Sequence, residues 1–107
     1  MIERLDAFLG EQDDRGRIIS YDRVAIVAVV GNEDGAHHVS AELFQGLNDL
    51  GFTIPANGVT YWTGQAMHKT DYVMLPETPK EVARATAMAA RNAAHLARVL
   101  SSANYPA

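Results

Sequence analysis

The hydrophobic and polar positions of the first thirty residues predict a helix, a polar loop and a strand. The helix is amphipathic, and its apolar face consists of Ile2, Leu5, Phe8 and Leu9. Gly10 follows as a stop signal, and the polar residues 11–17 predict a surface loop. The segment 24–30, VAIVAVV, is apolar on both alternating faces, as in a parallel strand covered by helices on each side. A buried helix is the alternative, but a short run rich in valine fits a strand better.

A second helix and a second strand follow. The helix has Phe44 beside one apolar stripe, which consists of Val39, Leu43, Leu47 and Leu50. Gly51 stands where a left-handed C-terminal cap belongs. Residues 52–62 then contain a short extended segment, a Pro and Asn-Gly turn, and the strand-like VTYW at 59–62.

The sequence from Thr78 predicts the start of a third helix. Thr78 offers an N-cap hydroxyl, Pro79 stands at the first helical position, and Glu81 completes a reciprocal capping box. A narrow stripe of mainly small residues continues to about Leu100, so we expect this helix to pack closely on a sheet or another helix.

The order helix, strand, helix, strand, helix predicts an α/β fold with a right-handed parallel crossover. We assign residues 1–107 to a single domain, since the length allows no more than one. A sheet of two strands is small for this class of fold.

Composition narrows the classes of partner. The formal net charge is -4, and the basic residues are scattered, so we expect no nucleic acid partner. No apolar run approaches the roughly 20 residues of a bilayer-spanning helix, so we expect no membrane association. The start of the chain lacks a secretion signal pattern and the sequence contains no cysteine, which together favour the cytoplasm.

The polar loop after the first strand is the candidate site. Ligands of open parallel sheets bind beyond the carboxyl ends of the strands, and GNEDGAHH, residues 31–38, occupies that position. Gly31 and Gly35 allow the backbone to turn its N–H groups toward a ligand, and the following helix adds a partial positive charge. The loop therefore suits electron-rich oxygen and nitrogen atoms.

Two other interpretations of the loop remain open. In the first, the loop has only a structural role: Asn32 and Asp34 cap the following helix, and the glycines make a tight turn. A metal site is the second, with Glu33, Asp34, His37 and His38 as its ligands. Adjacent helical histidines diverge by about 100°, which disfavours joint coordination. Ser40 lies in no nucleophile elbow and is interpreted as a surface residue.

A longer stretch carries a family resemblance. GNEDGAHHVSAELFQGLNDLGFTIPANGVTYWTGQAM at 31–67, a DY segment at 71–72 and the helix ETPKEVARATAMAARNAAHLARVL resemble the C-terminal half of flavodoxin-like NAD(P)H-dependent FMN reductases. The resemblance covers almost the whole chain. It implies a partial flavodoxin-like three-layer α/β fold in which VAIVAVV is the fourth of five strands.

The resemblance also implies a cofactor and an activity. Gly31, Asn32, Glu33, Asp34 and Gly35 match the loop that lies against the isoalloxazine ring of FMN. Members of the family transfer hydride from NAD(P)H through FMN to quinones, flavins or similar acceptors.

Aromatic residues of the second strand match the same site. Tyr61 and Trp62 match a YW segment near the site, and the resemblance implies a position from which their rings could stack on or wall the flavin or the nicotinamide. Core packing at the strand end is the alternative. Met67, His68 and Lys69 follow in a loop where family members often carry other residues, and an exposed lysine is usually only solvated.

The first half of the family pattern, which contains the phosphate-binding loop, has no counterpart in this sequence. In the family order the strand 24–30 lies between two others, so we expect one edge of it to pair with a second copy or with a complementing chain. A non-catalytic, self-associating module without bound flavin is the alternative function.

Overall fold

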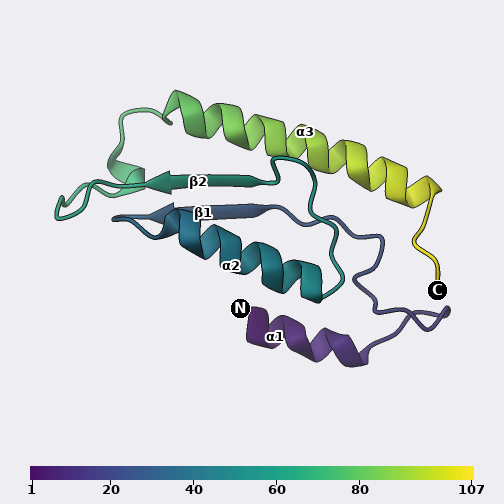
Figure 1. The fold of residues 1–107 in the computed structure, drawn as a ribbon. Helices are drawn as coiled ribbons and strands as arrows, with labels where there is room; N and C mark the ends of the chain where they lie inside the picture. Colours follow the sequence, from purple (N-terminus) through teal and green to yellow (C-terminus); the bar gives the residue numbers. More distant parts are fainter.

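The computed structural model describes all 107 residues and shows the predicted order of elements (Figure 1). The helices and strands are α1 (Ile2–Asp6), β1 (Val27–Gly31), α2 (Ala36–Asp49), β2 (Val59–Thr63) and α3 (Lys80–Ser102). Two short 3₁₀ helices accompany them, η1 (Ala7–Gly10) directly after α1 and η2 (Tyr72–Met74) before α3. The helix predicted to end at Gly10 therefore finishes in a tighter 3₁₀ turn.

The two strands form a parallel sheet between helices. Val27 pairs with Val59 and Gly31 with Thr63, so both strands end at the same edge. α2 packs against both strands on one face, and α3 packs against β2 on the other (Figure 1). The buried apolar residues are Val27, Ala36, Leu47, Leu50, Ala89 and Leu100. Ala89 is fully buried, as expected for a helix that uses small residues to lie close to its neighbours.

The first strand is shorter and less buried than predicted. It begins at Val27, and Val24 makes only an isolated bridge to Thr53. The prediction that helices cover both of its faces is wrong, because α3 lies over β2 and leaves this half of the sheet open. Ile26 is 44% exposed and Val30 is 59% exposed.

The second helix buries the C-terminal part of its predicted stripe, Leu47 and Leu50, but not its first residue. Val39 is 45% exposed, whereas Ser40 is only 2% exposed and donates to the carbonyl of Ala36 at 2.7 Å. The interpretation of Ser40 as a surface residue is therefore wrong. A hydroxyl is tolerated there because its one donor is satisfied within the helix.

The C-terminus of α2 follows the prediction. Gly51 has a φ of 91°, and its N–H donates to the carbonyl of Asn48 at 2.9 Å. The N–H of Phe52 donates to Leu47 at 3.1 Å, which completes a Schellman motif.

The predicted capping box of α3 does not form. Pro79, in an extended conformation with ψ of 137°, is itself the N-cap, and no side chain caps this helix. Thr78 therefore lies one residue too far from the helix for a reciprocal bond with Glu81.

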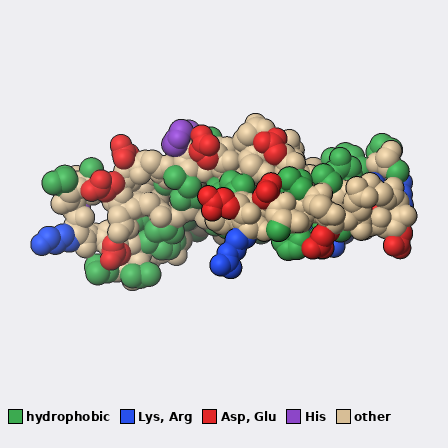
Figure 2. All heavy atoms as spheres, turned by 90° about the horizontal axis from the view of Figure 1, so that it is seen from below, with side chains coloured by type: hydrophobic (Ala, Val, Ile, Leu, Met, Phe, Trp, Pro, Cys, Tyr) green, Lys and Arg blue, Asp and Glu red, His purple; other side chains and the backbone are tan.

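The molecule is thin and expanded for its length. Its radius of gyration is 16.2 Å and its extents are 51 × 28 × 17 Å, against about 13 Å expected for the radius of a compact domain of this size. The accessible surface is 7452 Å², where about 5,800 Å² is usual for this mass. Figure 2 shows hydrophobic side chains exposed between acidic ones along the length of one face. Only 11 of the 107 residues are buried, so the core is small even for a single domain.

The C-terminal tail is attached to the loop that precedes β1. The guanidinium of Arg17 pairs with Asp13 and Asp22 at 2.7 Å each and donates to the carbonyl of Tyr105 at 2.8 Å. The N–H of Tyr105 donates in turn to Asp22. The pKa of Asp13 is lowered to about 2, because the backbone N–H of Arg17 and then its guanidinium bond the carboxylate. The pKa of Asp22 is lowered first by the N–H of Tyr105.

This network predicts a specific sensitivity to acid. A carboxylate with a lowered folded-state pKa stabilises the fold above its unfolded pKa and loses that effect as the pH falls through the folded value. We therefore expect the melting temperature to fall from about pH 4 down to about pH 2. Arg17→Met should reduce this dependence, because it removes the guanidinium and keeps the backbone N–H groups that also bond the two carboxylates. Arg91→Met, on an exposed position of α3, should leave it unchanged. Equal pH dependence in Arg17→Met and the wild type would contradict the assignment.

Candidate functional site

The candidate site lies at the carboxyl edge of the sheet, where two loops meet. β1 ends at Gly31 and β2 at Thr63, and the N–H of Gly64 donates to the carbonyl of Gly31 at 2.7 Å. The side-chain amide of Asn32 donates to Asp71 at 2.5 Å. These two bonds hold the loop 31–35 against the loop that follows β2.

The loop 31–35 presents unused backbone donors. The N–H groups of residues 32–38 donate to no protein acceptor, and the first helical bond of α2 runs from Val39 to Gly35 at 2.8 Å. Gly35 is the N-cap, with a left-handed φ of 85°, and no side chain caps the helix. The interpretation of Asn32 and Asp34 as helix caps is therefore wrong. A run of free N–H groups at a helix start forms a concave surface that attracts anions and electron-rich atoms.

Two close backbone approaches define the shape of the loop. A side chain at Gly64 would overlap the backbone carbonyl of Asn32, so that only glycine fits. A Cβ at Gly31 would lie 3.1 Å from the Cβ of Ala36, so the strand end and the helix start are also tightly packed. The loop is thus fixed from both sides by its neighbours, while its N–H groups remain open.

The two predicted aromatic residues lie on opposite faces of β2. Tyr61 stacks on His37 of α2, with ring centroids 5.2 Å apart and planes inclined by 9°. Trp62 lies on the α3 side, 5.4 Å from the ring of Tyr72. Tyr61 is 38% exposed, so its ring is not a core residue. The structure therefore does not join Tyr61 and Trp62 into one wall.

The possible metal ligands are not gathered. His37 stacks on Tyr61, whereas His38 lies 3.6 Å from Glu42 on the exposed side of α2. No three His, Asp or Glu side chains lie together as a metal-ligand group. The geometry does not support the metal interpretation of Glu33 and Asp34 with these histidines.

The loop after β2 supplies residues that sequence reasoning missed. Asp71 fixes the side chain of Asn32, Tyr72 contacts Trp62, and Gly64 receives the close approach of the first loop. The signal available in the sequence was a glycine at the end of each strand, Gly31 as the last residue of β1 and Gly64 directly after β2. Met67, His68 and Lys69 are exposed and belong to none of these contacts.

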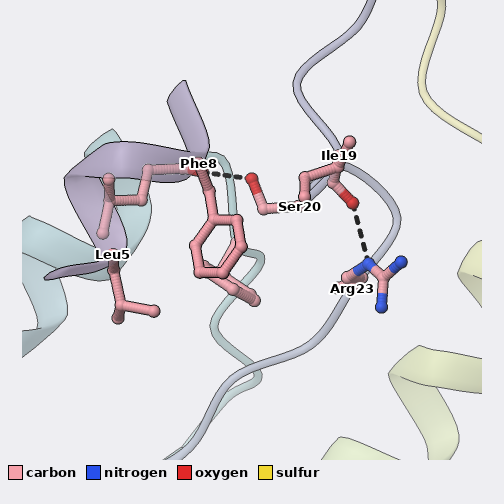
Figure 3. Close-up of a pocket in the computed structure, with 7 residues that line it drawn as sticks. Leu5, Phe8, Ile19, Ser20 and Arg23 are labelled. Atoms are coloured by element: carbon pink, nitrogen blue, oxygen red, sulfur yellow. Dashed lines mark hydrogen bonds between the residues drawn. The ribbon is translucent and has the colours of Figure 1, made fainter. Parts of the chain in front are cut away.

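A separate apolar cavity of about 240 Å³ lies at the opposite, amino edge of the sheet (Figure 3). Two polar groups of its lining already have partners within the chain, since Ser20 donates to the carbonyl of Leu50 and the Nε of Arg23 donates to the carbonyl of Ile19 at 2.7 Å. The residues that line it are Leu5, Phe8, Ile19, Ser20, Arg23, Leu50 and Phe52. α1 and η1 supply Leu5 and Phe8, and the other lining residues come from the segment before β1 and from the end of α2.

The chain is similar to a flavin enzyme over almost its whole length. It is 30% identical over 106 residues to the 8-demethyl-8-aminoriboflavin-5'-phosphate synthase of Streptomyces davaonensis, covering 98% of this chain and 41% of that protein. The crystal structure of RosB with bound 8-demethyl-8-formylriboflavin-5'-phosphate matches with a TM-score of 0.87 and 30% identity, over 97% of this chain and 42% of that one. The chain therefore spans about two fifths of these proteins. No family model matches it.

A shorter similarity involves a different class of protein. A stretch of 66 residues is 35% identical to the divalent metal cation transporter MntH of Mycobacterium bovis, and it covers 62% of this chain but 10% of the transporter. No helix in the structure combines the length and the apolar character needed to cross a bilayer.

The predicted fold class, a partial flavodoxin-like α/β arrangement, is confirmed by the RosB match.

Proposed function

We propose that this chain forms the ring-facing part of the FMN site of a flavin-dependent enzyme. The observation that carries the proposal is the run of free N–H groups at residues 32–38, at the carboxyl edge of a sheet similar to that of a flavin-bound enzyme. The predicted residues Gly31, Asn32, Glu33, Asp34 and Gly35 all lie in or beside this run.

The donors and acceptors of the loop suit the edge of an isoalloxazine ring. The pyrimidine part of that ring carries several oxygen and nitrogen acceptors and one N–H donor. Free backbone N–H groups at the start of α2 match the acceptors. Asn32 directs its amide nitrogen at Asp71, which leaves its carbonyl oxygen able to accept from the ring N–H.

The chemistry comes from the flavin, which carries hydride or electrons between substrates. The residues of this chain bind and orient the ring, and none of them is proposed as a catalytic acid, base or nucleophile. We propose NAD(P)H as the hydride donor and a quinone, flavin or similar molecule as the acceptor, in line with the family resemblance. Since the chain spans about two fifths of its relatives, groups outside this sequence would complete the site.

A second candidate function is a non-catalytic module that associates with itself and holds no flavin. The expanded shape and the open strand edge favour it. Stable oligomers that take up no flavin would support this candidate over the first.

Comparison of FMN with riboflavin tests the proposal. If the chain contacts the ring and not the phosphate, titration with the chain should quench the fluorescence of FMN and of riboflavin alike. The two dissociation constants should agree within about threefold, because a tenfold preference needs about 1.4 kcal/mol of additional contact. Gly35→Ala should weaken the binding of both flavins, because a φ of 85° is strained for alanine. Gly10→Ala should weaken the binding of neither flavin. Absence of quenching by either flavin at millimolar concentration, with the chain folded by circular dichroism, would overturn the proposal.

A further inference from the structure

One edge of β1 has no hydrogen-bonding partner. The sheet contains two strands, so β1 has a single neighbour. The N–H of Val27 donates to Gly58 at 2.9 Å, and the carbonyl of Gly31 accepts from Gly64, so the odd-numbered residues of β1 face β2. Since a strand is pleated, the backbone groups of Ile26, Ala28 and Val30 point to the opposite, open edge.

The open edge lacks the usual protection against pairing. Natural edge strands carry lysine, proline or a bulge. Between Val24 and Val30 this strand carries no charge and no proline. Ile26 is 44% exposed, Val30 is 59% exposed and Ala28 is exposed between them. The edge therefore offers unused backbone groups flanked by exposed apolar side chains.

We propose that two copies of this chain pair through this edge, antiparallel, about a two-fold axis at Ala28. In this register Ala28 faces the partner's Ala28, and Ile26 faces the partner's Val30. In this register the backbone groups of Ile26, Ala28 and Val30, which point to the open edge, all have partners in the other copy. A shift of two residues would leave some of these groups unpaired. The product is a continuous four-stranded sheet with the order β2, β1, β1 and β2.

Charge at the two ends of β1 favours a second copy as the occupant. Arg23 precedes the strand and makes no ion pair, whereas Glu33 and Asp34 follow it and are also unpaired. Antiparallel pairing brings Arg23 toward the partner's Glu33, since both residues are equally distant from Ala28 in the sequence. Parallel pairing would bring like charges together, and it would not give a closed two-fold dimer.

The pairing has a consequence for the candidate site. It places the partner's Arg23 at the end of the sheet where the loop 31–35 lies, so each copy brings a cation to the acidic loop of the other. The inference does not depend on flavin binding, because it rests only on the edge of β1 and on the charges at its ends.

Proline and lysine substitutions at the edge test the pairing. Light scattering after size exclusion at micromolar concentration should show a dimer for the wild type. Ala28→Pro removes an N–H that β2 does not use, so it should weaken the dimer at least tenfold while the circular dichroism of the monomer persists. Val30→Lys, which keeps every backbone group, is the second variant should Ala28→Pro fail to fold, and should have the same effect. A monomeric wild type, or a dimer unaffected by a folded variant, would overturn the proposal.

Two further measurements test the register. The chain has no cysteine, so Ala28→Cys should give a disulfide-linked dimer on mild oxidation, while the exposed control Ala97→Cys on α3 should not. Arg23→Glu should weaken the dimer, and adding Glu33→Arg should restore it. A double variant no tighter than Arg23→Glu alone would overturn the antiparallel arrangement. A monomer that gains a strand only from another polypeptide would assign the edge to a complementing chain instead.

Discussion

Gly51→Ala is expected to lower the free energy of unfolding by about 2–5 kcal/mol. Gly51 has a φ of 91° in the Schellman motif of α2, and the left-handed region costs an L-residue about 1–2 kcal/mol. The added Cβ would also lie 2.7 Å from the hydroxyl of Ser20 and 2.9 Å from the ring of Tyr21. Overlap of this kind in a packed region costs about 1–3 kcal/mol more.

Gly16→Ala separates the two contributions to this effect. Gly16 also has a positive φ, of 74°, but a Cβ there meets nothing within 4 Å. We therefore expect Gly16→Ala to cost only the backbone strain. Urea denaturation measures both changes, provided that the m-value stays constant. Equal losses in the two variants would show that the contact with Ser20 and Tyr21 relaxes without cost.

Gly64→Ala is expected to cost about 1–3 kcal/mol and to displace the loop 31–35. The added Cβ would overlap the backbone carbonyl of Asn32 and lie 2.9 Å from the ring of Trp62. Since the overlapped group is backbone, no side-chain rotation relieves it, and the loop has to move. The hydrogen bonds from Gly64 to Gly31 and from Asn32 to Asp71 should weaken together.

Amide resonances of residues 31–35 and flavin titration read out this displacement. Large shifts confined to the two loops, with weaker quenching of both FMN and riboflavin, are the expected result. Gly10→Ala is the matched control, because a Cβ there meets nothing within 4 Å and no positive φ is involved. Unchanged loop resonances in Gly64→Ala would show that Gly64 does not hold the loop in place.

Most of the elements could be predicted because their signals are local. Gly51 ends α2 as expected, since a left-handed residue after an amphipathic stripe is a short-range pattern. The capping box at Thr78 was wrong although its signal is equally local. Pro79 takes the N-cap position itself, so the helix begins at Lys80, one residue later than the pattern predicts.

The candidate site was predicted in position but not in its contacts. The loop 31–35 follows a parallel strand, which suffices to place it at the carboxyl edge. Its partner Asp71 is 39 residues from Asn32 in the sequence, and no local pattern relates them. The separation of Tyr61 from Trp62 follows from the pleat, which sends adjacent strand residues to opposite faces.

By itself, the sequence determined the order of helices and strands, the parallel sheet and the glycine loop beyond its first strand, because hydrophobic period and turn residues act over a few positions. The tertiary structure alone decided which faces are covered. α3 lies over β2 and leaves β1 open, so apolar residues that suggested a strand buried on both faces instead line an exposed edge. Burial depends on what packs against a residue, and that contact comes from segments distant in the chain.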